Sequence, residues 1–181
     1  MKHLAILIAL SLGSFVHADE KILFNGKDLT GWKGLPAFWS VKDGAITGQA
    51  TAANPVKENT FLIWEGEVGD FELSFKYKIT DGDGKAEKGG NSGVQYRSKD
   101  LGKWVVSGYQ AEIENKQGKV GFLYHEKGRK YLANVGEKVV IGADGKPAVA
   151  GELAKKEELI AKGYYKEKEW NEYRIIARGN R

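Results

Sequence analysis

The residues whose types and spacing best suit chemistry lie between positions 89 and 115, in the stretch GGNSGVQYRSKDLGKWVVSGYQAEIEN. Two runs in this stretch alternate between apolar and polar residues, as expected of neighbouring β-strands. Successive side chains of a strand point to opposite faces, so the polar residues of both runs share one face if the apolar ones point into a core. These polar residues are Gln95, Arg97, Gln110, Glu112 and Glu114.

An arginine, two glutamines and a carboxylate on one face could hydrogen-bond a polyhydroxylated ligand such as a sugar. The glycines that flank Asn91 add to this hypothesis, because residues without side chains permit a close approach of backbone to ligand. The plainer interpretation is a solvated outer face, which is common in antiparallel sheets and needs no function. Alternation alone favours the solvated face, and both interpretations stay open at this point.

The elements that must position these residues are strands. Many short alternating runs between glycine turns predict an all-β sandwich. Asp43-Gly44 between apolar runs predicts a hairpin over residues 38–48, and residues 71–79 alternate without a fault. The other expected elements are strands over residues 119–125 and 170–178 and one short helix over residues 152–162.

The first 18 residues have the pattern of a secretory signal peptide, with Lys2, a short apolar run and Ala18 before the expected cleavage point. The run is too short to span a membrane, so we predict an exported protein, periplasmic or extracellular, without a membrane anchor. The mature domain is expected over residues 19–181. Because a sandwich strand followed by turn residues is an unusual end for a domain, we expect that domain to be incomplete at its C-terminal end.

Composition excludes several classes of site. The chain has no cysteine, which excludes disulfides, thiolate metal sites and a thiol nucleophile. Removal of Lys2 with the leader lowers the formal net charge from +4 to +3. Lysines and glutamates are interspersed along the sequence, which predicts a solvated surface rather than a nucleic-acid interface.

Seven motifs occur in a fixed order along the chain: LFNGKDLTGW, WSVKDGAITG, GDFELSFKYKI, GGNSGVQYRS, VSGYQAEIEN, GFLYHEKGR and EWNEYRIIARGNR. Together they resemble the 3-keto-disaccharide hydrolase domain family, formerly a domain of unknown function, over essentially the whole mature chain. The resemblance implies a concanavalin-like jelly-roll sandwich. It also implies cleavage of glycosides that are oxidised to a ketone at carbon 3.

In the implied chemistry, the ketone at carbon 3 acidifies the proton on carbon 2. A general base removes that proton, the aglycone leaves carbon 1 by elimination, and water is added afterwards. Such a site needs a base, a hydrogen-bonding or cationic group for the enolate, and an acid for the leaving oxygen.

The resemblance places catalytic roles on three residues. Glu112 is the expected carboxylate, Arg97 is expected to bind the carbonyl or enolate, and His125 has the unperturbed pKa best suited to proton transfer near neutrality. If Val120, Phe122 and Tyr124 point into the core, then His125 shares a face with Glu112 and Tyr124 is core packing. A lone histidine in a strand is more often structural, so both interpretations of His125 stay open. Substrate binding is expected from Asn91, Gln95, Arg97, Gln110, Trp64 and Trp104, the tryptophans by stacking on sugar rings.

The alternative function is a non-catalytic carbohydrate-binding module, because jelly rolls host many lectins and fold does not fix function. An ordinary endo-glycanase ranks last, since the paired carboxylates of such an enzyme lack their usual spacing here. No cofactor is required by the motifs and no metal ligand is assigned. A divalent metal that polarises the ketone stays open, and it would need carboxylates such as Glu112 and Glu114. The expected partner is a small-molecule or oligosaccharide substrate, and no partner protein is identified.

Overall fold

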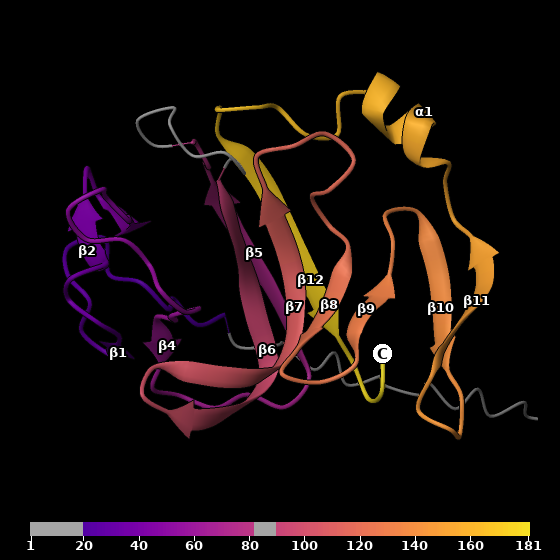
Figure 1. Cartoon of the computed structure of the whole chain (residues 1–181), viewed down its shortest axis with the longest axis horizontal. Coiled ribbons are helices and arrows are strands. Elements are labelled where there is room, and N and C mark those ends of the chain that lie inside the picture. Colours follow the sequence, from indigo (N-terminus) through magenta and orange to yellow (C-terminus); the bar gives the residue numbers. More distant parts are fainter. Residues whose placement is uncertain (1–19, 82–89) are drawn as a thin grey trace, which may run out of the picture.

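The computed structural model describes residues 20–81 and 90–181 and is almost entirely β-structure (Figure 1). Its one helix, α1, covers Lys156–Ala161. The strands are β1 (Trp32–Lys33), β2 (Trp39–Lys42), β3 (Ala45–Gly48), β4 (Ile63–Trp64), β5 (Phe71–Tyr77), β6 (Asn91–Gly102), β7 (Val105–Glu114), β8 (Leu123–Glu126), β9 (Lys130–Ala133), β10 (Glu137–Ile141), β11 (Pro147–Glu152) and β12 (Asn171–Ala177).

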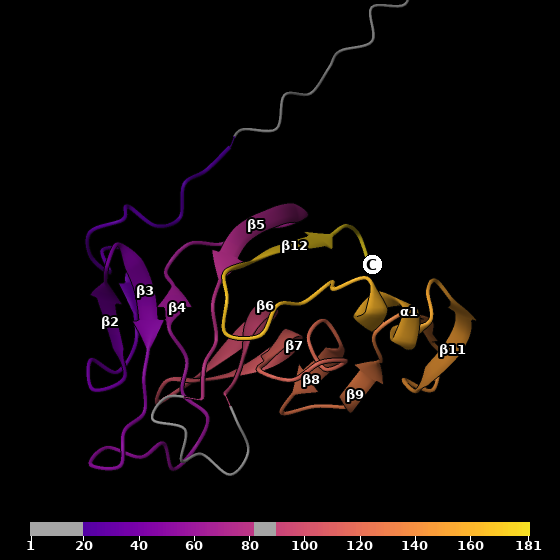
Figure 2. The same cartoon turned by 90° about the horizontal axis from the view of Figure 1, so that it is seen from above.

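The largest sheet has four antiparallel strands in the order β6-β7-β8-β9. The antiparallel pair β5-β12 forms a second layer over one face of this sheet, as the view from above shows (Figure 2). The pairs β2-β3 and β1-β4 lie beside β6, and the hairpin β10-β11 lies beyond β9 (Figure 1). This arrangement confirms the predicted all-β fold and agrees with a jelly-roll sandwich.

Aromatic packing joins the two layers. Phe71 at the start of β5 packs edge-on against Tyr96 of β6, with ring centroids 5.9 Å apart. Tyr173 of β12 stacks on Phe75 at 5.4 Å and donates a hydrogen bond of 3.3 Å to the backbone carbonyl of Glu112. Along β5, half-buried and exposed residues alternate without a fault, as predicted from the sequence. One face of the four-stranded sheet therefore packs against β5 and β12, and its other face points away from them.

Two tight turns have the same geometry. Asp43 and Gly44, which connect β2 and β3, have φ angles of 51° and 72°. Positive φ at both central residues matches the twist of a hairpin, and the predicted hairpin is confirmed. Lys103 and Trp104 connect β6 and β7 in the same way, with φ angles of 53° and 62°.

Two predicted elements differ in extent. The helix expected over residues 152–162 forms only over Lys156–Ala161. The strand expected over residues 119–125 begins at Leu123, because an irregularity precedes it: Glu112 donates its N–H to the carbonyl of Phe122 and accepts from the N–H of Gly121. Gly121 has a φ of 94°, which glycine adopts at little cost.

The predicted signal peptide lies outside the described residues, so its cleavage after Ala18 stays a prediction. Within residues 20–81 and 90–181, no helix has the length and apolar character needed to cross a membrane.

Candidate functional site

A row of side-chain hydrogen bonds crosses β6 and β7 on the face that points away from β5 and β12. Gln95 donates to the Oε1 atom of Gln110 at 2.6 Å. Gln110 in turn donates to Oε2 of Glu112 at 2.7 Å, and Asn91 donates to Oε1 of the same carboxylate at 2.6 Å. The prediction that Gln95, Gln110 and Glu112 share a face is therefore confirmed, and Asn91 joins them.

The register of the two strands produces this row. Gln95 lies directly opposite Gln110, and Gly93 lies opposite Glu112. A Cβ atom on Gly93 would come within 2.6 Å of Cγ of Gln110. The missing side chain therefore leaves the space in which the Gln110 amide reaches the carboxylate of Glu112.

The carboxylate of Glu112 is nearly enclosed, since the residue is only 2 % exposed. None of the ion pairs in the described part of the chain includes it. Burial raises the pKa of Glu112 above the ordinary carboxyl value, although the bonds from Gln110 and Asn91 oppose that rise. A carboxylate with a raised pKa and two fixed amide partners is oriented for proton transfer.

Three residues that the sequence did not single out complete this face. Tyr124 of β8 lies directly opposite Gln110 and is half-buried. Tyr131 of β9 pairs with Tyr124, packs edge-on against its ring at 5.2 Å, and is 61 % exposed. Glu126, two residues after Tyr124 and 6 % exposed, accepts a long bond of 3.5 Å from Asn59. The face thus combines amides, carboxylates and an accessible aromatic ring, as sugar-binding surfaces do.

One buried acceptor on this face has no donor. Oε1 of Gln95 is buried and receives no hydrogen bond from the described residues. Buried polar atoms are nearly always satisfied in folded proteins, so such an atom needs an explanation. A ligand hydroxyl or a bound water would supply the missing donor.

The structure places His125 on the opposite face, which corrects the expectation that it shares a face with Glu112. His125 lies opposite Tyr109, and their rings are 5.2 Å apart. Nδ1 of His125 accepts a hydrogen bond of 3.1 Å from Nε of Arg129. A second nitrogen of the same guanidinium donates to the hydroxyl of Tyr109 at 2.9 Å. Burial and the nearby Arg129 charge lower the pKa of His125. These contacts are those of a neutral, structural histidine.

Arg97 also lies away from Glu112. The ladder is irregular between Tyr96 and Lys99, and Arg97 has a φ of 49°, so the alternation of β6 breaks at this residue. Its guanidinium donates to the backbone carbonyl of Gly179 and to Asp70 at 3.3 Å. The structure therefore gives Arg97 a role in joining β6 to the start of β5 and the end of β12.

The two tryptophans expected to stack on sugar lie elsewhere. Trp64 is in β4 opposite Trp32, and the Lys21 ammonium lies 4.6 Å from the centre of its ring. Trp104 occupies the β6-β7 turn, at the end of β7 remote from Glu112, and its carbonyl accepts from the N–H of Phe61. Among described contacts, none links either indole to Glu112, and Tyr131 is the accessible aromatic residue on the Glu112 face.

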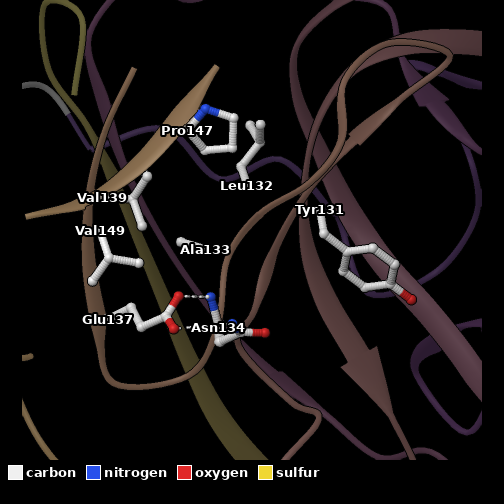
Figure 3. A pocket seen from close by; sticks show the side chains of 8 residues that line it. All are labelled: Tyr131, Leu132, Ala133, Asn134, Glu137, Val139, Pro147 and Val149. Carbon is white, nitrogen blue, oxygen red and sulfur yellow. Dashed lines mark hydrogen bonds between the residues drawn. The ribbon is translucent and has the colours of Figure 1, made fainter. Parts of the chain in front are cut away.

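Two hollows in the described structure lie apart from Glu112. A pocket of about 210 Å³ separates β9 from the β10-β11 hairpin, and Figure 3 shows its apolar side chains above the hydrogen-bonded pair Asn134 and Glu137. Tyr131 also lines this pocket, at its edge, and its ring is turned away from the other lining side chains in the same view. A groove of about 510 Å³ runs between β12 and the strands β7 and β8 on the core face. The hydrogen-bonded row around Glu112 lines neither hollow, so that site is a shallow sheet face.

Glu114 is near Glu112 along β7 but pairs with Asn91 across the ladder. Within the described ranges, no three histidine, cysteine, aspartate or glutamate residues are grouped closely enough to hold a metal ion. The face around Glu112 therefore offers acid-base and hydrogen-bonding groups, and metal use stays an open prediction.

Residues 19–181 match the model of the 3-keto-alpha-glucoside-1,2-lyase-like domain. No curated protein matches the chain.

Proposed function

The chain belongs to the family of 3-keto-alpha-glucoside-1,2-lyase-like domains, and we propose that it cleaves 3-keto-glycosides with Glu112 as the general base. The family supports a carbohydrate-active role for the whole matched region. The face around Glu112 adds the chemistry, because it offers one enclosed carboxylate beside amides that suit sugar hydroxyls.

In the proposed reaction, Glu112 takes the proton from carbon 2 of a sugar that carries a ketone at carbon 3. The electron pair of that C–H bond forms the C1–C2 double bond, and the bond from carbon 1 to the aglycone oxygen breaks. Hydration of the product would complete a net hydrolysis. Gln95, Gln110 and Asn91 would hold hydroxyl groups of the substrate or fix the carboxylate.

The observation that carries this proposal is the environment of Glu112. Its carboxylate is 2 % exposed, has two amide donors at 2.6 and 2.7 Å, and has a pKa raised by burial. A carboxyl group on a merely solvated face would be hydrated and would keep its usual pKa. A buried carboxylate without an ion pair lowers stability, and such groups are concentrated at functional sites.

The test compares a 3-keto-glycoside that carries a chromogenic aglycone with the same glycoside before oxidation. We expect release from the keto substrate alone. Glu112→Gln, which keeps shape and polarity but cannot accept the proton, should lower turnover by about two to four orders of magnitude. The control is Glu114→Gln, the next carboxylate on the same strand face, which should lose far less.

A second function is favoured by Tyr131, whose exposed ring packs against Tyr124 on the face that carries the amides and would also suit a non-catalytic sugar-binding module. In that case the wild type would bind sugar without releasing the aglycone, and Glu112→Gln would keep most of the affinity. Cleavage of unoxidised polysaccharide instead would support an ordinary glycanase.

We also propose that the protein is exported. The support is the leader-like segment over residues 1–18, with cleavage expected after Ala18. Amino-terminal sequencing of protein recovered from the periplasm or medium would test this: a mature chain that begins at Asp19 supports export, and an intact leader on cytoplasmic protein contradicts it.

A further inference from the structure

Elimination leaves one chemical need that Glu112 does not meet. While Glu112 accepts the proton from carbon 2, the departing aglycone oxygen develops negative charge and needs a proton of its own. His125 and Arg97, the other groups expected to act, lie away from this face. Tyr124 is on the Glu112 face, carries a hydroxyl group and has no assigned role.

We propose that Tyr124 is the proton donor to the leaving oxygen, an inference that rests on the proposed function. Tyr124 lies opposite Gln110, and Gln110 holds Glu112 by a bond of 2.7 Å. Tyr124 is therefore a diagonal neighbour of Glu112 across the β7-β8 ladder. Diagonal neighbours in a sheet are roughly 7–8 Å apart. At that separation a phenol and a carboxylate can both contact one sugar ring.

Neighbouring residues fix the ring of Tyr124. Tyr131 packs edge-on against it, with an interplanar angle of 81°. Since Tyr131 is 61 % exposed, this side of the pair is open to a ligand. Tyr124 itself is half-buried, so the residue is neither enclosed in the core nor fully exposed.

Electrostatics favours the protonated phenol. Burial comes first among the causes that raise the pKa of Tyr124, followed by electrostatic interactions with Glu126, Tyr131 and Glu112 in that order. The raised pKa favours the phenol that still carries its proton, which is the state that the first step requires of a proton donor. Glu126 is a poorer donor because it lies opposite Gly108, whereas Tyr124 lies opposite Gln110, which is nearer to Glu112 along β7.

The step balances without another reactant. The C2–H bond breaks and its proton goes to Glu112, while its electron pair forms the C1–C2 double bond. The C1–O bond breaks, its electron pair goes to the aglycone oxygen, and that oxygen takes the proton of Tyr124. Proton transfer from Glu112 to the phenolate through water then restores both groups.

The test is a series of 3-keto-glycosides whose aglycones range from nitrophenols to simple alcohols. A nitrophenolate leaves without help, whereas an alkoxide needs protonation. We expect Tyr124→Phe to release nitrophenol at a rate close to that of the wild type. It should lose about two to four orders of magnitude in rate with alcohol aglycones. A role in packing alone would slow all substrates to the same extent.

The matched control is Tyr109→Phe, which also removes one hydroxyl group. Tyr109 precedes Gln110 in β7 and lies on the sheet face opposite to Glu112, so any loss of rate in this variant should be the same for all aglycones. If Tyr124→Phe fails to fold, 3-fluorotyrosine at position 124 gives a second readout. Its lower phenol pKa should move the alkaline limb of the pH-rate profile to lower pH. A uniform loss across the series, or an unmoved alkaline limb, would overturn the role of Tyr124. A wild type that releases no aglycone would overturn the proposed function as well.

Discussion

Gly93 provides a sharp perturbation, because its missing side chain makes room for the Gln110 amide. In Gly93→Ala, the new Cβ would lie 2.6 Å from Cγ and 2.7 Å from Cδ of Gln110, so this flexible side chain must move. The backbone itself accepts alanine, since Gly93 is not among the residues with positive φ. We therefore expect the fold to survive and the bond of 2.7 Å from Gln110 to Glu112 to be lost.

The expected magnitude follows from that bond. A hydrogen bond to a charged group contributes about 1.5–3 kcal/mol, which corresponds to roughly a 10-fold to 150-fold loss in kcat/KM. The lost bond also lowers the pKa of Glu112 in the wild type. Its removal should therefore move the acidic limb of the pH-rate profile to higher pH, and the loss should be largest in acid.

The assay is kcat/KM against pH for the wild type, Gly93→Ala and the control Gly151→Ala. Gly151 also lies in a strand, but a Cβ atom added to it would meet nothing within 4 Å, so that variant should behave as the wild type. Unchanged kinetics in Gly93→Ala, with the fold intact by circular dichroism, would refute the role of the Gln110 contact.

Three further predictions concern stability and placement. The folded pKa of Glu112 is raised, so its ionisation opposes folding. The Tm of the wild type should therefore fall relative to that of Glu112→Gln as pH rises through the folded pKa of Glu112. A difference in Tm between the two proteins that stays constant with pH would contradict this. The folded pKa of His125 is lowered, so the free energy of unfolding should fall as pH drops below about 6.5. His125→Gln should flatten that fall and keep far more activity than Glu112→Gln. Equal losses of activity in the two variants would support a catalytic histidine. Arg97→Ala should lower the free energy of unfolding in urea by about 0.2–1 kcal/mol, because its partner Asp70 is largely exposed. A loss of catalysis without a loss of stability would show that Arg97 acts in the site.

Alternation in the sequence predicted the central part of the site and failed where the ladder is irregular. Gln95, Gln110 and Glu112 lie in regular register, so period-two alternation placed them together. Arg97 lies within an irregularity of the ladder and has a positive φ, which removes it from the face that alternation assigned to it. No composition signal in that stretch marks the break.

The faces of β8, the strand expected within residues 119–125, were predicted wrongly for a different reason. Tyrosine has an apolar ring and a polar tip, so hydrophobic alternation does not decide which side Tyr124 occupies. Pairing with Gln110 decides it, and pairing is a tertiary property. The sequence likewise did not single out Tyr131, because its place on this face depends on its pairing with Tyr124, which is seven residues away in sequence.

The central claim, that Glu112 removes the proton on carbon 2 of a 3-keto-glycoside, is tested most directly with substrate deuterated at carbon 2. The wild type is incubated with labelled and unlabelled substrate, and release of the aglycone is followed beside formation of the conjugated enone. We predict slower release from the deuterated substrate and an enone that appears with the aglycone. Equal rates for both substrates, with aglycone released and no enone at any stage, would contradict proton abstraction at carbon 2.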